Sequence, residues 1–282
     1  MAVGVWGVGY KGWPMVSRRS RHLAGTQTAG GIGAAGRFPS CQIRLLRRLK
    51  IVYLTIDDSP SELMAARVAL LSELRIPAVF FCTGDRLSAR SQPVIEAILR
   101  GFVIGNHSWD HPHFSQLTLA QAEAEISSTD ELIDRLYAEA GREREHRWFR
   151  FPFGDQGDDF AGQDAPPALR AHKLKLQSCL RAFGYSTPPF PDITHPWFWP
   201  RGADADWYWT FESMDWAVSQ NELSVKDALA RLDIHDPAQR LALGDRSSAD
   251  ILVLHDHSHS ARAFESLIEA LASRPLQFTL PD

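Results

Sequence analysis

The fold of this chain is decided by the stretch Ile51-Val52-Tyr53-Leu54-Thr55-Ile56-Asp57-Asp58. Its first six residues predict a short buried strand, which runs into two carboxylates and then Ser59-Pro60. An amphipathic helix is expected from about residue 61, and it ends before Ile76-Pro77 because the residue before proline disfavours the helical region. Residues 78–82 predict a second buried strand. The folded part of the chain therefore begins as a strand, a helix and a strand.

The same alternation continues toward the end of the chain. Thr118 and Gln121 form a capping box at the start of the longest expected helix. Buried strands that alternate with helices indicate a parallel sheet covered by helices, either an open doubly wound sheet or a closed barrel. Both architectures place working residues just beyond the carboxyl ends of the strands. The further predicted strands are 102–104, 147–151, 207–211 and 251–254, and the further helices are 93–100, 118–140, 224–232 and 260–273.

Composition excludes several classes of protein. The chain has 282 residues, of which 44% are hydrophobic and 23% charged, and no apolar run approaches the length of a transmembrane segment. Its 3 cysteines are too few for a disulfide framework. Residues 1–50 hold nine of the 30 Lys and Arg and none of the 34 Asp and Glu. The remainder is therefore acidic, which argues against a nucleic-acid groove.

Residues 1–47 predict a flexible, basic, glycine-rich extension that precedes a catalytic domain at 48–282. Nine of the 19 glycines fall in the first 40 residues. Arg18 and Arg19, followed by a weakly apolar stretch, are somewhat similar to a twin-arginine export signal, and organelle transit peptides have a similar composition. A disordered extension or a misassigned start codon explains it equally well, so cytoplasmic and exported locations both stay open. We expect residues 1–45 to be dispensable for catalysis.

Five polar clusters lie at or just after the predicted strands. Each has an ordinary interpretation when taken alone. A pair of Asp residues after a strand often begins a helix, and His107 and His111 share one face only if their segment is helical. Arg150 could be an ion-pair partner and His255 part of a surface loop. Their joint placement suggests one shared site, made of Asp57-Asp58, 107–111, 150–155, Asp215-Trp216 and His255-Asp256.

These clusters resemble the five ordered motifs of the polysaccharide deacetylases of carbohydrate esterase family 4. That family includes chitin, chitooligosaccharide and peptidoglycan N-acetylglucosamine deacetylases. Residues 55–58, Thr-Ile-Asp-Asp, are similar to its Thr-Phe-Asp-Asp, and residues 107–111 to its His-Ser/Thr-x-x-His. Residues 150–154 are similar to Arg-x-Pro-Tyr-Gly, with Phe153 in place of Tyr. Residues 209–216 are similar to its Trp/Asp-Trp motif. Residues 252–255, Leu-Val-Leu-His, are similar to its closing Leu-x-Leu-x-His motif, with one position fewer before the histidine.

The resemblance spans residues 51 to about 280 and implies an α/β fold, a distorted (β/α) barrel of about seven repeats. An aromatic-rich insert at 155–206 would separate the third and fourth motifs. Most of its aromatic side chains are expected to pack the insert onto the barrel, and others could shape a glycan groove.

The activity that the resemblance implies is metal-dependent removal of acetyl groups from an N- or O-acetylated polysaccharide or oligosaccharide. Asp58, His107 and His111 would hold a divalent metal, zinc or otherwise Co²⁺ or Ni²⁺, with open positions for water and substrate. Asp57 would be the general base and His255 the general acid.

The remaining roles also come from the resemblance. Arg150 would hold Asp57, and Asp215 would orient and charge His255. The backbone N–H of Phe153 would help to form an oxyanion hole. Trp216 and Leu252 would form apolar walls around the acetyl methyl group.

Two other functions stay open for the same fold. One is a metal-dependent amidohydrolase of a small non-glycan amide, and the other is a non-catalytic carbohydrate-binding homologue. A homologue that had lost catalysis is expected to lack Asp57, a metal ligand or His255, and all of these are present. The expected partner is an acetylated glycan and not a nucleic acid. The sequence does not select the substrate, the choice between N- and O-deacetylation, or the oligomeric state.

Overall fold

The computed structural model describes residues 49–159, 164–198, 204–236, 241 and 243–281. All of these belong to one of the two units into which the chain divides, residues 47–282. The predicted extension and the segment similar to a twin-arginine signal lie outside the described residues. Of the helices that these residues form, none combines the length and the apolar character that a bilayer crossing needs.

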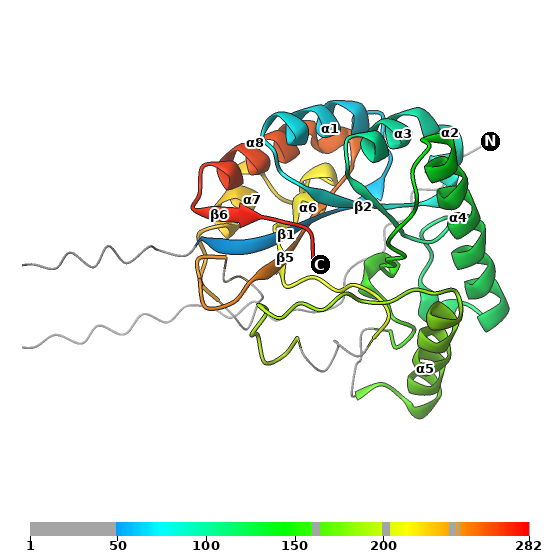
Figure 1. Cartoon of the computed structure of the whole chain (residues 1–282). Coiled ribbons are helices and arrows are strands. Elements are labelled where there is room, and N and C mark those ends of the chain that lie inside the picture. The colour runs from blue at the N-terminus through cyan, green and yellow to red at the C-terminus, as the bar shows by residue number, and fades with distance from the viewer. Residues whose placement is uncertain (1–48, 160–163, 199–203, 237–240, 242, 282) are drawn as a thin grey trace, which may run out of the picture. The chain divides into compact units, whose positions relative to one another are not determined.

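A parallel six-stranded sheet lies at the centre of the structure (Figure 1). Its strand order is β3-β2-β1-β5-β4, and β6 pairs with β1. β1 is central because it pairs with three other strands, and buried apolar residues continue along it, as expected where both faces of a parallel sheet are covered. The strands are β1 (Lys50–Ser59), β2 (Ala78–Cys82), β3 (Val103–Asn106), β4 (Phe211–Glu212), β5 (Asp250–His255) and β6 (Leu276–Phe278).

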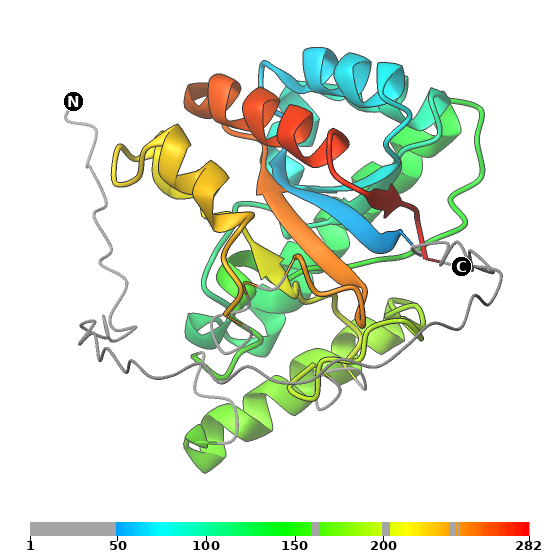
Figure 2. The ribbon, with the colours of Figure 1, turned by 90° about the vertical axis from the view of Figure 1, so that its left-hand side faces the viewer.

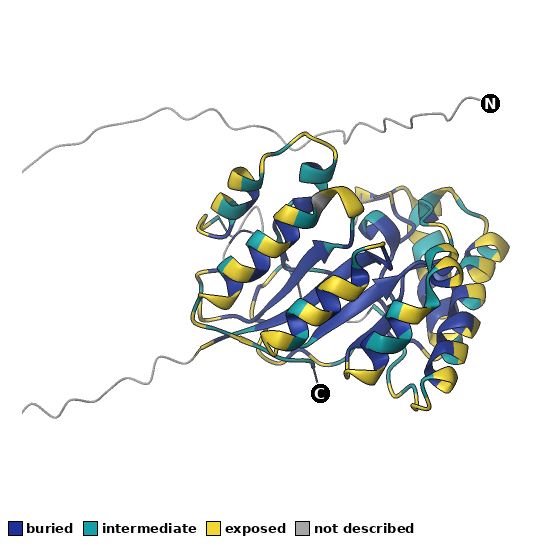
Figure 3. Cartoon of the chain, turned by 90° about the horizontal axis from the view of Figure 1, so that it is seen from above, coloured by how far each residue is buried: buried dark blue, intermediate teal, exposed yellow. Residues whose placement is uncertain are grey.

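Helices cover this sheet. α1, α3 and α8 lie along one face, whereas α5 lies on the other side of the sheet (Figures 1 and 2). Seen from above, the covering helices turn their buried residues toward the strands and their exposed residues outward (Figure 3). The helices are α1 (Met64–Glu73), α2 (Gly84–Ala89), α3 (Ser91–Leu99), α4 (Leu119–Glu139), α5 (Pro167–Ala182), α6 (Asp215–Ser219), α7 (Val225–Arg231) and α8 (Ala261–Ala272), with short 3₁₀ turns η1 (Phe114–Gln116), η2 (Pro152–Gly154) and η6 (Ser258–Ser260).

The capping box predicted at Thr118 is confirmed. The Gln121 N–H donates to the Thr118 hydroxyl oxygen at 3.3 Å, and the Thr118 N–H donates to the Gln121 side-chain oxygen at 2.9 Å. These two bonds satisfy N–H groups that a helix start otherwise leaves unpaired. Three helices, α2, α5 and α6, and the strand β6 were not predicted.

Beyond β3, backbone hydrogen bonds connect further extended segments and curve the sheet toward β5, as in a distorted barrel. The Asn106 N–H donates to the Trp148 carbonyl at 2.8 Å, and the Arg150 N–H donates to the Asn106 carbonyl at 3.0 Å. The Trp207 N–H then donates to the Phe149 carbonyl at 2.8 Å. The parallel α/β fold class predicted from the sequence is therefore confirmed.

The two strands predicted at 147–151 and 207–211 are largely wrong. The first makes a single bridge, between Asn106 and Phe149, and is followed by Pro152, which has no N–H to donate. In the second, only Phe211 belongs to β4. The rings of Tyr208 and Trp209 stack with centroids 4.4 Å apart, which a pleated strand does not allow for consecutive residues.

Two apolar clusters lie on the two sides of the sheet. Alternate residues of β1 separate them, with Val52, Leu54 and Ile56 facing α1, α3 and α8, and Tyr53 facing the barrel interior. The interior cluster contains several aromatic side chains of the insert and its flanks. Those that are buried there confirm the packing role expected of them; they are Phe190, Phe198 and Trp207.

A buried ion pair joins the amino ends of β1 and β5. The Lys50 ammonium lies 2.6 Å from one carboxylate oxygen of Asp250. The other oxygen lies 2.9 Å from the His195 ring and accepts a hydrogen bond from the Thr210 hydroxyl at 2.7 Å. Asp250 therefore holds both β1 and the insert at this end of the barrel.

Replacing Asp250 by Ala is expected to lower the free energy of unfolding by about 3–5 kcal/mol, because it removes the carboxylate that balances the buried charge of Lys50. Urea unfolding measures the change. Glu96→Ala is the control, since it breaks the exposed ion pair with Arg100 on α3, and we expect it to cost less than about 0.5 kcal/mol. Equal losses in the two variants would contradict this account.

Candidate metal and catalytic site

The end of β1 sends its two carboxylates in different directions. Ile56 pairs with Phe80 and Ser59 with Cys82, so β1 has one extra residue at this point. Asp58 lies in this bulge with φ of 61°, in the left-handed region that Asp tolerates better than most residues. As a result, Asp57 contacts Arg150, whereas Asp58 contacts histidines.

Three predicted metal ligands come together at this bulge. Asp58 Oδ1 lies 3.1 Å from His111 Nε2 and 3.6 Å from His107 Nε2. The potential ligand atoms of the three residues all lie within 4.8 Å of one another. Asp58 and His107 are buried, whereas the His111 side chain is 27% exposed, which leaves one side of the group accessible.

The segment that carries the two histidines is a turn. Ser108 and His111 have φ values of 68° and 64°, which a helix does not contain. The Glu125 carboxylate accepts the backbone N–H groups of Trp109 and Asp110 at 2.8 and 3.1 Å. Helical spacing therefore does not bring the imidazoles together here; a turn pinned to α4 does.

The protonation states of this group fit a divalent metal. His107 Nδ1 lies 2.8 Å from the Arg150 carbonyl, which can only accept, so the Nε2 lone pair faces Asp58. Burial lowers the pKa of His107 to about 4, so the imidazole is neutral, as a ligand must be. Burial raises the pKa of Asp58, but its contacts with His111 and His257 outweigh burial and hold that pKa well below its usual value. One carboxylate and two imidazoles are the donor set of a catalytic zinc site.

Arg150 anchors the neighbouring carboxylate. Its Nη1 donates to Asp57 Oδ1 at 2.8 Å and to the Thr55 hydroxyl at 2.6 Å. The guanidinium lies over the Phe81 ring, 4.4 Å from the centroid. Asp57 Oδ2 remains 3.9 Å from His107 Nε2. Asp57 therefore lies beside the candidate metal group but is not one of its three ligands.

His255 forms a second carboxylate–imidazole pair at the end of β5. Asp215, the first residue of α6, has Oδ1 3.0 Å from His255 Nδ1 and accepts the His255 backbone N–H on Oδ2 at 2.8 Å. Burial alone would lower the pKa of His255, but the negative charge of Asp215 outweighs it and raises that pKa to about 10. The imidazole therefore keeps its proton well above neutral pH.

Replacing Asp215 by Asn is expected to lower the pKa of His255 from about 10 toward the ordinary value, because a neutral amide removes the charge that holds the proton. If the activity needs protonated His255, its decline on the basic side of the pH–rate profile will then begin at a lower pH. NMR titration of the imidazole in the metal-free protein measures this pKa. Asp233→Asn, at a carboxylate whose side chain is 75% exposed, is the control. An unchanged titration of His255 in Asp215→Asn would refute the assignment.

The three residues predicted to contact substrate do not all lie at the candidate site. Phe153 has φ of 58° and its ring centroid lies 4.4 Å from that of His111, at the edge of the candidate site. Trp216 follows Asp215 on α6, and its indole N–H donates to Glu212 at 2.7 Å. Leu252 is fully buried in the cluster beneath the helices. Because it lies three residues before His255, it faces the opposite side of β5, so the structure does not bring it to the site.

His257 is a residue that sequence analysis missed. Its Nε2 lies 2.6 Å from Asp58 Oδ2. The signal was its spacing, since two residues separated by one other point to the same side of an extended segment, and His255 was already a candidate.

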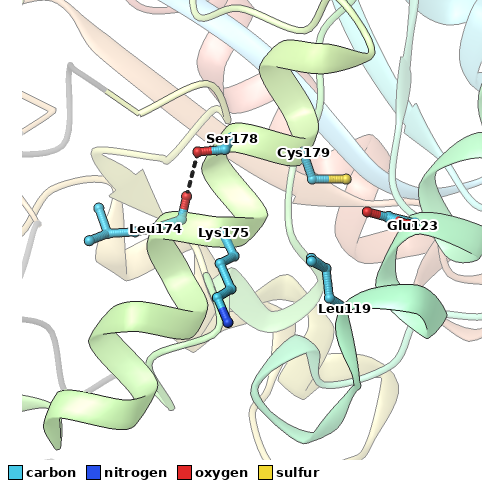
Figure 4. A pocket seen from close by; sticks show the side chains of 6 residues that line it. All are labelled: Leu119, Glu123, Leu174, Lys175, Ser178 and Cys179. Atoms are coloured by element: carbon cyan, nitrogen blue, oxygen red, sulfur yellow. Dashed lines mark hydrogen bonds between the residues drawn. The ribbon is translucent and has the colours of Figure 1, made fainter.

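A separate pocket lies between the amino end of α4 and α5, with a volume of about 400 Å³ (Figure 4). It contains none of the residues of the candidate site. Burial raises the pKa of Cys179 to about 11, so this thiol stays protonated and is a poor nucleophile. The pocket is lined by Leu119, Glu123, Leu174, Lys175, Ser178 and Cys179.

Comparison with known proteins finds relatives in sequence and in fold. Residues 47–166 match the family model described as polysaccharide deacetylase. The chain is 31% identical over 121 residues to a chitooligosaccharide deacetylase of Sinorhizobium fredii, a match that covers 43% of this chain and 54% of that protein. It is 30% identical over 88 residues to the peptidoglycan-N-acetylmuramic acid deacetylase PdaC of Bacillus subtilis, covering 31% of this chain and 19% of that protein.

Solved structures extend the likeness of the fold. A family 4 carbohydrate esterase from Streptomyces lividans, in complex with acetate, superposes with a TM-score of 0.53 at 22% identity, covering 82% of this chain and 92% of that chain. The peptidoglycan deacetylase PdaC of Bacillus subtilis gives a TM-score of 0.53 at 19% identity, covering 82% and 87%. The resemblance to polysaccharide deacetylases is therefore confirmed, and the fold is that of family 4 carbohydrate esterases. The matches to the two curated relatives span from about a fifth to about half of those proteins.

Proposed function

We propose that this protein is a metal-dependent hydrolase that removes acetyl groups from an N- or O-acetylated polysaccharide or oligosaccharide. The observation that carries the proposal is the group of Asp58, His107 and His111, whose ligand atoms lie within 4.8 Å of one another. An anchored carboxylate, Asp57, and a protonated imidazole, His255, accompany this group at the same end of the sheet. Together they form the ligand, base and acid set that amide or ester hydrolysis needs.

We assign the following roles to the chain's own residues. A divalent metal held by Asp58, His107 and His111, zinc or otherwise Co²⁺ or Ni²⁺, would polarise the acetyl carbonyl and activate water. Asp57, held by Arg150, accepts a proton from the attacking water.

His255 donates a proton to the leaving nitrogen or oxygen. Asp215 orients its ring and keeps it protonated. The backbone N–H of Phe153 contributes to the oxyanion hole, worth about 3 kcal/mol in measured cases. Trp216 forms an apolar wall for the acetyl methyl group. We place these functions in residues 48–282 and regard residues 1–47 as an extension outside the catalytic domain.

An acetate-release screen tests the proposal. The substrates are chitooligosaccharides, peptidoglycan fragments and acetylxylan, each assayed with added Zn²⁺, with Co²⁺ and after removal of metal by a chelator. Metal-dependent acetate release from one of these supports the proposal. Glycan binding without acetate release would favour a carbohydrate-binding homologue. A small non-glycan acetamide is assayed alongside the glycans, and acetate release from it but from none of the glycans would favour an amidohydrolase.

A further inference from the structure

The tripeptide His255-Asp256-His257 is held rigidly at the end of β5. The buried Asp256 carboxylate accepts the N–H and the hydroxyl of Ser61 at 2.7 and 2.6 Å, and it forms an ion pair with Arg67 of α1. Arg67 also donates to the His257 carbonyl at 2.8 Å. The backbone that carries His257 is therefore fixed to Arg67 of α1 at two points, the Asp256 carboxylate and the His257 carbonyl.

The His257 ring is held through both of its nitrogens. Nε2 lies 2.6 Å from Asp58 Oδ2, and Nδ1 lies 3.0 Å from the Ser219 hydroxyl oxygen. Ser219 is itself fixed, because its hydroxyl donates to the Trp216 carbonyl at 2.6 Å. One short helix, α6, thus supports two imidazoles, that of His255 through Asp215 and that of His257 through Ser219.

The two oxygens of Asp58 have separate neighbours. Oδ1 is the oxygen 3.1 Å from His111 and 3.6 Å from His107, whereas Oδ2 is the oxygen next to His257. His257 is not part of the group whose ligand atoms all lie within 4.8 Å. Its contact with Oδ2 leaves Oδ1 as the carboxylate oxygen that faces His107 and His111, and a hydrogen bond to one oxygen opposes rotation of the carboxylate.

We propose that His257 is a positioning residue of the candidate metal site, which orients Asp58 as a ligand through Oδ1. This inference rests on the proposed function only in that Asp58 binds the metal. Residues that hydrogen-bond to metal ligands typically raise metal affinity or activity by ~10–100-fold. His257 is expected to act in that range.

The test compares Co²⁺ binding to the parent with binding to four variants. His257→Ala and His257→Phe remove the hydrogen-bonding nitrogens, and the second keeps most of the ring volume. His257→Gln keeps a donor that can reach Asp58. His259→Ala removes an exposed imidazole two residues away and is the matched control. Titration calorimetry gives the affinity, the visible absorption of bound Co²⁺ reports its coordination, and circular dichroism checks folding.

The Ala and Phe variants are expected to bind Co²⁺ ~10–100-fold more weakly, with an altered absorption spectrum. The Gln variant is expected to recover most of the affinity, and His259→Ala to behave as the parent. Parent-like affinity and spectrum in a folded Ala or Phe variant would overturn the inference. Because the Phe variant preserves packing, it decides the question if the Ala variant does not fold.

The same experiment, extended to the ligand variant His107→Ala, separates this inference from the proposed function. If His107→Ala loses Co²⁺ while both folded variants without the donor keep it, only the role of His257 is wrong. A parent that binds no metal would overturn both. A parent that binds metal with the expected dependence on His257, yet releases no acetate from any substrate, would leave this inference standing and the proposed function refuted.

Discussion

Asp57→Asn is expected to lower the rate of deacetylation by ~10²–10⁴-fold, while metal binding remains close to that of the parent. The amide has nearly the shape of the carboxylate but cannot accept the proton. Metal binding should persist because the ligand is the neighbouring Asp58, whose Oδ1 faces the two histidines. Rates of acetate release and metal analysis of the purified variant measure the two effects.

The substitution also removes a charge beside Arg150, whose guanidinium is fully buried. Urea unfolding must therefore accompany the assay, so that lost activity is not lost folding. Asp110→Asn is the matched control, since Asp110 is an exposed carboxylate of the neighbouring histidine turn. Parent-like turnover by Asp57→Asn on every substrate that the parent cleaves would show that Asp57 is not the base.

The effect of Asp57→Asn should combine with that of His255→Ala in a particular way. Both residues serve one sequence of proton transfers, so the double variant is expected to lose less than the product of the two single losses. A double-mutant cycle on the rate of acetate release measures this coupling. Independent losses that multiply would contradict a shared reaction sequence.

The double variant His107→Ala/His111→Ala is expected to lose its bound divalent metal and, with it, essentially all deacetylation. Only Asp58 would remain of the three ligands, so the loss of affinity should exceed the ~10–100-fold typical of losing one outer partner. Metal analysis after dialysis measures occupancy. The control is His146→Ala/His259→Ala, which also removes two imidazoles but leaves the candidate group untouched. If His107→Ala/His111→Ala retains the same metal occupancy as the parent, the assignment of the metal ligands is wrong.

Much of the fold could be predicted from the sequence because its signals are local. The apolar run that forms β1, the proline that follows α1 and the capping box of α4 each act within a few residues. The segments at 147–151 and 207–211 show the limit of such signals. Both are apolar or aromatic enough for a strand, but a following proline and a stacked pair of rings restrict them to short contacts.

The sequence by itself predicted that Asp57, Asp58, His107, His111 and His255 gather at the carboxyl ends of parallel strands, because such strands end at a common edge of the sheet. Only the tertiary structure decided which contacts each of these side chains makes and how its pKa is shifted. The bulge in β1 separates the carboxylates of Asp57 and Asp58. Helix α6 brings Asp215 to His255 and Ser219 to His257. Burial lowers the pKa of His107, whereas the charge of Asp215 raises the pKa of His255. It also removed Leu252 from the site and added His257. These outcomes depend on contacts between residues as much as 199 positions apart, which no local pattern encodes.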